Sequence, residues 1–122
     1  MTPDELEARS RMFALRCMQV VRALPGDACG RSIGQQLMRS ATSVYANYRA
    51  VRRGRSSREF VAKLSIVVEE ADEAEMWLGL ISDDGMLPRG RLAPLRKEAD
   101  ELKRIFAASR KTASGKRKPP PA

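Results

Sequence analysis

The chain is poor in the residues that most enzymes and β-sheet proteins depend on. Its 122 residues include no histidine, two cysteines and six aromatic side chains. Without histidine there can be no Ser-His-Asp triad, Cys-His pair or Glu-x-x-His di-metal site, and two cysteines alone do not make a zinc site. No glycine-rich phosphate loop is present. Because runs of aromatic and β-branched residues are scarce, β structure is disfavoured. We therefore expect an all-α protein that is not an enzyme and carries no cofactor.

Long apolar runs are also missing. No stretch approaches the roughly 20 apolar residues of a membrane span, and acidic residues occupy the N-terminal segment where a signal peptide would be apolar. We expect no membrane association and a reducing, cytoplasmic setting in which both thiols stay free. Cys17 falls on an apolar helix face and is expected in the core, whereas Cys29 is expected in a loop.

Charge is distributed unevenly along the chain, and the net charge is +8. Between Gly30 and Arg58 there are seven arginines and no acidic residue, whereas between Val61 and Asp84 there are seven carboxylates and one lysine, Lys63. Such a balance favours a polyanionic partner, either RNA or DNA or an acidic protein surface. The alternative is an ordinary solubilising surface.

Capping signals and breakers divide the chain into four helices. The first opens with a capping box at residues 2–5 and ends before Pro25. The second covers about 31–53, the third follows a capping box at 56–59 and ends at Gly85, and the fourth runs from about 90 to 110. Short connections predict an antiparallel up-down-up-down four-helix bundle over residues 1–111. Residues 112–122 are predicted to form a disordered basic tail.

Apolar residues recur at helical spacing on one face of each predicted helix. These stripes are Leu6, Phe13, Cys17, Val20 and Leu24; Ile33, Leu37, Val44, Tyr48 and Val51; Phe60, Leu64, Val67, Ala71, Ala74, Leu78 and Ile81; and Leu92, Leu95, Ala99, Leu102 and Phe106. The third helix carries a second apolar set on another side, comprising Ile66, Met76, Trp77 and Leu80. A monomeric bundle needs one stripe per helix, so Ile66, Trp77 and Leu80 predict a contact with another subunit.

Polar residues border the predicted core. On the second helix they are Arg39, Ser40, Ser43 and Asn47, and on the third Glu70 and Glu73. An ion pair between Arg39 and a glutamate is expected across helices or subunits, where it would fix their register. The carboxylates at 69–75 surround the helix rather than converge, which predicts a solvated or ion-paired face instead of a metal site.

A cluster of basic residues marks the turn between the second and third helices. It consists of Arg49, Arg52, Arg53, Arg55 and Arg58, and Lys116, Arg117 and Lys118 add a basic segment near the C-terminus. Arginine forks suit phosphate groups. Since Tyr45 and Tyr48 are the only nearby aromatic residues, binding should depend on the nucleic-acid backbone rather than on base sequence.

Together these residues resemble a known family. The stretch at 36–49, Gln-Leu-Met-Arg-Ser-Ala-Thr-Ser-Val-Tyr-Ala-Asn-Tyr-Arg, is followed by Phe60, Lys63-Leu64, Glu70, Glu73 and Trp77-Leu78. This pattern is similar to that of the bacterial four-helix-bundle family that includes the 23S rRNA intervening-sequence protein. One departure is Ala50, where family members commonly carry glutamate. The resemblance implies a ring-shaped homopentamer. It also implies kinship with the accessory variability determinant of diversity-generating retroelements, a basic pentamer that partners a reverse transcriptase and nucleic acid.

The sequence thus predicts a non-catalytic homo-oligomer, with five subunits implied by the resemblance, that associates with nucleic acid through a basic surface. The alternative is a protein-interaction scaffold or an accessory subunit, for example of a reverse transcriptase, without a direct nucleic-acid role.

Overall fold

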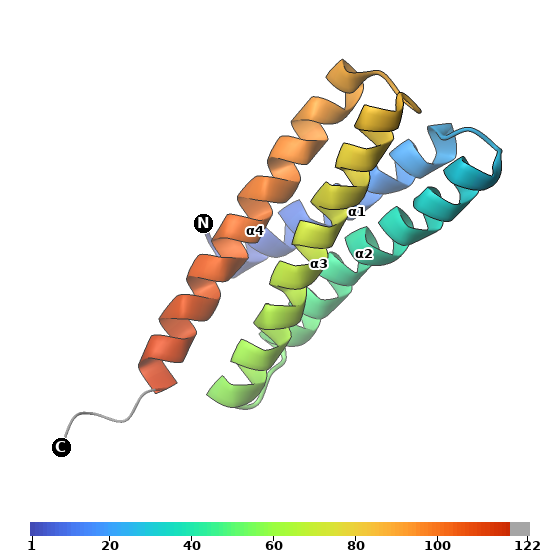
Figure 1. Cartoon of the computed structure of the whole chain (residues 1–122). Coiled ribbons are helices and arrows are strands. Elements are labelled where there is room, and N and C mark those ends of the chain that lie inside the picture. The colour runs from blue at the N-terminus through green and yellow to red at the C-terminus, as the bar shows by residue number, and fades with distance from the viewer. Residues whose placement is uncertain (118–122) are drawn as a thin grey trace.

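The computed structural model describes residues 1–117, with side chains through Gly115. Four helices follow one another: α1 (Pro3–Ala23), α2 (Ala28–Arg52), α3 (Ser57–Asp84) and α4 (Arg89–Arg117). The part of the chain that is described contains no strand. The predicted all-α fold with four helices is therefore confirmed (Figure 1).

The capping residues that mark the helices in the sequence occupy those roles in the structure. Thr2 Oγ1 accepts a hydrogen bond of 3.1 Å from the Glu5 amide at the start of α1. Ser56 Oγ accepts one of 3.1 Å from the Glu59 amide at the start of α3. Gly85 ends α3 with a φ of 77°, a left-handed conformation that glycine adopts without a steric penalty.

Two predicted boundaries differ from the structure. Asp27 Oδ1 accepts a 2.8 Å hydrogen bond from the Gly30 amide, so α2 begins at Ala28 rather than near residue 31. Cys29, predicted in a loop, is consequently an exposed residue of the first turn of α2. The predicted disordered tail begins too early, because α4 continues through residue 117. Ala113 and Ser114 are half-buried there beside the start of α3. Residues 118–122 lie outside the described part.

The four predicted apolar stripes form one continuous core. Phe13 of α1 and Phe106 of α4 are completely buried, and the Tyr48 ring packs against Phe106 with ring centroids 5.3 Å apart. Leu24, Ile33 and Phe60, at the ends of their stripes, are half-buried. Cys17 is fully buried, which confirms its predicted place in the core.

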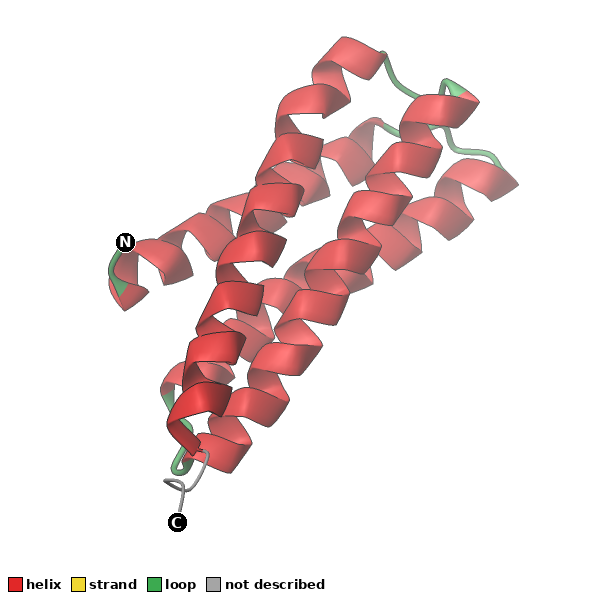
Figure 2. Cartoon of the chain, turned by 60° about the vertical axis from the view of Figure 1, so that its left-hand side comes forward, coloured by secondary structure: helices red, strands yellow, loops and turns green. Residues whose placement is uncertain are grey.

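The helices pack mainly against their neighbours in sequence, so α3 lies between α2 and α4. Helix α1 crosses the other three at an angle and meets α4 over a short region (Figure 2). That meeting point includes an ion-pair cluster, in which Arg9 Nε donates to Glu98 at 2.9 Å and Arg9 Nη2 donates to Glu101 at 2.9 Å. Among the described residues, no helix is long and apolar enough to cross a bilayer.

Candidate nucleic-acid interface

The arginine-rich corner comprises Arg49, Arg52, Arg53, Arg55 and Arg58, and all five are exposed. Helix α2 ends at Arg52, the chain turns through Gly54, and α3 begins at Ser57. The connection between the antiparallel helices α2 and α3 thus brings these side chains together at one end of the bundle.

Arg52 differs from the other four because its charge is already compensated. Its Nη2 lies 2.6 Å from Asp4 Oδ1 and its Nη1 lies 3.2 Å from Glu7 Oε1. The hydrogen bond to Asp4 is the main reason that the pKa of Arg52 is raised. Arg52 therefore ties α2 to α1, and it is less available than its neighbours for binding a polyanion.

The remaining corner arginines make no ion pair within the described part of the chain. Arg49 lies over the ring of Tyr45, with 5.9 Å between the guanidinium carbon and the ring centroid. This cation–π contact orients the side chain without neutralising it. Arg53, Arg55 and Arg58 are exposed, and no carboxylate pairs with them among the described residues. Their positive charge is thus available to an external anion.

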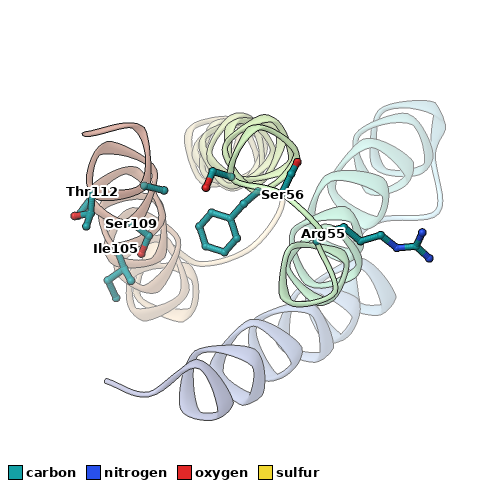
Figure 3. A pocket seen from close by; sticks show the side chains of 10 residues that line it. Arg55, Ser56, Ile105, Ser109 and Thr112 are labelled. Atoms are coloured by element: carbon teal, nitrogen blue, oxygen red, sulfur yellow. The ribbon is translucent and has the colours of Figure 1, made fainter. Parts of the chain in front are cut away.

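A hollow of about 780 Å³ lies beside this corner, between the start of α3 and the end of α4. Ile105, Ser109 and Thr112 of α4 and Ser56 at the start of α3 line it, whereas the Arg55 side chain runs away from α4 (Figure 3). Hydroxyl groups and apolar side chains dominate the hollow. Among the described residues, Arg55 is the one corner arginine that lines this hollow, and its side chain points away from α4, so the corner offers exposed arginines rather than a closed phosphate pocket.

The predicted basic segment near the C-terminus is only partly described. Lys116 and Arg117 lie in the last turn of α4, and their side chains are not described. Lys118 lies outside the described residues. Their proposed role in binding stays a prediction.

Further exposed arginines, outside the predicted basic cluster, lie on α1 and at the start of α2. They are Arg11, Arg22 and Arg31, none of which pairs with a carboxylate in the described structure. A signal for them was present in the sequence, because Asp27 is the one acidic residue between Ala8 and Arg58. The uncompensated positive surface therefore extends beyond the corner along α1 and α2.

Arg39 forms the predicted ion pair, and it does so across helices. Its Nη1 lies 2.9 Å from Glu70 Oε2 and its Nη2 lies 2.6 Å from Glu73 Oε2. The hydrogen bond from Arg39 is the largest cause of the lowered pKa of Glu73. One arginine of α2 is thus bound to two carboxylates of α3, which fixes the position of α2 relative to α3.

The other polar residues of the predicted core border satisfy one another within α2. The Ser40 hydroxyl, completely buried, donates to the Gln36 carbonyl oxygen at 3.1 Å. Asn47 Nδ2 donates to the carbonyl and hydroxyl oxygens of Ser43, at 2.9 and 2.8 Å. These contacts are internal to one helix, as expected of a structural role.

Two further acidic side chains of α3, Asp72 and Glu75, are ion-paired. Asp72 Oδ1 accepts a 3.0 Å hydrogen bond from Lys103, and Glu75 Oε1 lies 2.9 Å from Arg96 Nη2. In residues 1–117 no three acidic or cysteine side chains come together as a metal site would require. The prediction of an ion-paired acidic face is confirmed for Glu70, Glu73 and these two residues.

The second apolar set on α3 is exposed in the single chain. Ile66 has 43% of its surface accessible and Leu80 has 45%, while Trp77 is half-buried against the core. The indole Nε1 of Trp77 is buried without an acceptor among the described residues. The surface that the sequence predicts to contact another subunit is therefore uncovered in one chain.

Comparison with known proteins identifies the family of this bundle. The family described as 23S rRNA-intervening sequence protein matches residues 5–108. A crystal structure of a protein with unknown function, from the S23 ribosomal protein family and from Bacteroides thetaiotaomicron, is 26% identical to this chain. The match covers 91% of this chain and 99% of that one, with a TM-score of 0.84. No curated protein gives a significant match. The chain therefore belongs to the 23S rRNA-intervening sequence protein family.

Proposed function

We propose that this protein is a homo-oligomer that associates with nucleic acid through its arginine-rich surface and performs no catalysis. The observation that carries the proposal is the uncompensated charge of Arg49, Arg53, Arg55 and Arg58 at one corner. Arg39 and Arg52, by contrast, are held in internal ion pairs with carboxylates. A cationic surface of this kind gains affinity for phosphates by releasing counterions.

Assembly would strengthen this attraction. Ile66, Met76 and Leu80 are exposed apolar side chains on α3. Because exposed apolar surface often marks a protein–protein contact, we propose that a second copy covers them. The resemblance implies five subunits, and five copies at +8 each would carry about +40, a strong field for a polyanion.

The absence of catalysis is proposed from the chemistry of the chain. The sequence has no histidine, and carboxylates such as Glu73 and Glu75 are held by arginines rather than directed at an open site. General acid–base catalysis usually needs a group whose pKa is moved towards neutrality, whereas the pKa of Glu73 is lowered.

The direct test is fluorescence anisotropy with labelled RNA and DNA across a salt series. The affinity should fall steeply between about 50 and 200 mM salt, with a log–log slope near −0.9 per phosphate contact. The double variant Arg53→Gln with Arg58→Gln should weaken binding and flatten the slope. The matched control, Arg89→Gln with Arg91→Gln, removes the same charge from exposed positions in the first turn of α4.

Absence of binding at about 50 mM salt, or a slope near zero, would rule the proposal out. An equal loss in the corner variant and in its control would show that net charge, not this corner, governs binding. The alternative function is that of an accessory subunit whose basic surface binds an acidic protein. In that case a protein partner should still be recovered in a pull-down after nuclease treatment.

A further inference from the structure

Four exposed arginines form two pairs on the outer side of α1 and α2, the two helices that carry the uncompensated charge. Arg22 and Arg31 flank the connection between the helices and are called here the loop pair. Arg11 and Arg49 lie nearer the other end and are called the corner pair. We propose that these pairs bind duplex nucleic acid, each contacting one of the two phosphate rows that border a single groove. This inference rests on the proposed function and adds the class of nucleic acid and the mode of contact.

The register of the two helices is fixed at both ends. Near the corner, Arg52 of α2 pairs with Asp4 and Glu7 of α1. Near the connection, a Cβ added at Gly34 of α2 would lie 3.3 Å from the side chains of Val21 and Leu24 of α1, so the helices lie close together there. Since both segments are continuous helices, this register sets which turns of α1 face which turns of α2, although the two helices separate towards the start of α1, where they cross at an angle (Figure 1).

Helical geometry then brings the four arginines to one side of the molecule. Arg11 follows Asp4 by seven residues and Arg22 follows Arg11 by eleven, which are close to two and three helical turns. Both arginines therefore lie on the same side of α1 as Asp4, the residue that pairs with Arg52 of α2. On α2, Arg31 and Arg49 are eighteen residues apart, five turns of about 3.6 residues, so they point in one direction.

One acidic side chain, the exposed Asp27, lies near this face, in the connection that the loop pair flanks. It is the one carboxylate between Ala8 and Arg58, and it caps α2 by accepting from the Gly30 amide, so its charge is directed at the helix N-terminus. Asp4 and Glu7, at the edge of the face, share Arg52, which offsets one of their two negative charges. Arg31 donates to the Gly26 carbonyl oxygen, which orients its guanidinium but leaves its charge uncompensated. The face therefore presents two positive regions.

The separation of the pairs suits two phosphate rows. At 1.5 Å per residue, Arg31 and Arg49 lie about 27 Å apart along α2, and Arg11 and Arg22 about 16 Å apart along α1. The major groove of B-DNA is about 12 Å wide between its phosphate edges. These separations exceed the groove width, but once the phosphates themselves and the reach of the flexible arginine side chains are included, the two pairs are able to contact opposite borders of one groove.

A single strand suits this face less well. Proteins that bind single strands usually stack the bases on exposed aromatic rings, but here the half-buried Tyr45 is covered by Arg49. A flexible strand would lose conformational freedom on two rigid helices without gaining stacking in return. A duplex presents phosphates that are already ordered, so the same four arginines favour it, and without a preference for base sequence.

The test compares a labelled duplex of about 20 base pairs with either of its single strands, as RNA and as DNA, across a salt series. Three variants separate the two pairs: Arg22→Gln with Arg31→Gln, Arg11→Gln with Arg49→Gln, and all four together. The control is Arg89→Gln with Arg91→Gln, which matches the charge removed by each double variant. Circular dichroism confirms that each variant is folded.

We expect the duplex to bind about tenfold more tightly than the single strand at about 100 mM salt. Each pair variant should weaken duplex binding about fivefold to tenfold and reduce the salt slope by about two, while the control changes it less than twofold. Equal or tighter binding of the single strand, or a loss confined to one pair, would overturn the inference and leave the proposed function standing. Failure of every nucleic acid to bind would overturn both.

Discussion

Arg96 of α4 lies across Gly79 of α3 and donates two hydrogen bonds to Glu75, from Nε at 3.0 Å and from Nη2 at 2.9 Å. A Cβ added at Gly79 would lie 3.2 Å from the Arg96 Nη2 atom. The glycine thus gives the guanidinium room to approach the helix surface and reach a carboxylate one turn earlier. This contact joins α3 to α4, just as the ion pairs of Arg39 join α3 to α2.

The substitution Gly79→Ala should raise the free energy of unfolding by up to about 1 kcal/mol. Alanine is favoured over glycine in a helix interior by about that amount, and the flexible, partly exposed Arg96 can move by a few tenths of an ångström. An exposed ion pair contributes only about 0–1 kcal/mol. Urea denaturation measures the change, and a decrease of more than about 1 kcal/mol would show that Arg96 cannot yield.

Gly30 should respond in the opposite way, because its neighbour is backbone. A Cβ at Gly30 would lie 1.9 Å from the Pro25 carbonyl oxygen, a distance that only movement of the connection between α1 and α2 could relieve. Gly30→Ala should lower the free energy of unfolding by about 1–3 kcal/mol, as overpacking in a core does. Gly90→Ala in α4, where nothing lies within 4 Å, is the control and should be neutral or slightly stabilising.

Local signals in the sequence were enough to predict the helices and their core faces. Thr2 and Ser56 cap through their own side chains, and Gly85 adopts a conformation that few other residues tolerate, so each boundary depends on nearby residues. The end of α4 was missed because no proline or capping glycine stops it before Gly115. There, Ala113 and Ser114 are half-buried and line hollows together with residues at the start of α3, an arrangement that nearby residues in the sequence do not signal.

The candidate interface was less predictable, because compensation of charge depends on tertiary contacts. Nothing in the local sequence distinguishes Arg52, which reaches Asp4 and Glu7 of α1, from the uncompensated Arg53 beside it. Similarly, Arg11 and Arg22 belong to the positive surface only because α1 packs beside α2 in the register that Arg52 helps to fix. Clusters in the sequence therefore identified the corner but not the full face.

The two thiols should differ sharply in reactivity. Burial raises the pKa of the Cys17 thiol to about 12, whereas Cys29 is exposed. At pH 8 a thiol-specific reagent should modify only Cys29 in the native chain and both cysteines after denaturation, and Cys29→Ser should abolish the native reaction. Rapid modification of Cys17 in the folded Cys29→Ser variant would contradict its burial.

The same burial predicts a pH dependence of stability. The folded pKa of Cys17 lies above the ordinary value of 9.0, so the unfolded chain loses this proton first as the pH rises. The contribution of the thiol is fully present below pH 9 and declines as the pH approaches 12. Urea titrations of wild type and of Cys17→Ala at increasing pH should show a shallower alkaline decline in the variant.

Arg39 should govern part of the acid response. Because its hydrogen bond lowers the pKa of Glu73, the pair contributes to stability above the unfolded pKa of the glutamate and loses this contribution as the pH falls through the folded value. Arg39→Gln should destabilise the chain at neutral pH and lessen the further loss below about pH 4.5. Arg104→Gln, which removes a more exposed pair with Asp100, is the control and should change this dependence little.

The exposed apolar face of α3 provides the test of assembly. If a second copy covers Leu80, then Leu80→Arg places a charge in an apolar contact and should dissociate the oligomer, while the thermal stability of the helices changes little because Leu80 is 45% exposed in the chain. Light scattering with size-exclusion chromatography should give the wild type a multiple of 13.6 kDa, about five if the ring implied by the resemblance forms, and the variant a smaller mass. Ala93→Arg, at an exposed position of α4, should leave the mass unchanged.

Trp77→Ala is a less selective probe of the same face. Trp77 is half-buried and packs against the core, so truncating it removes apolar contacts within the chain as well as any contact with a neighbour. The variant should therefore lose stability and assembly together, whereas Leu80→Arg should lose assembly first. A wild-type chain that is monomeric at micromolar concentration, with an unchanged mass in Leu80→Arg, would show that this face stays open to solvent, and the proposed gain of affinity from assembly would then be lost with it.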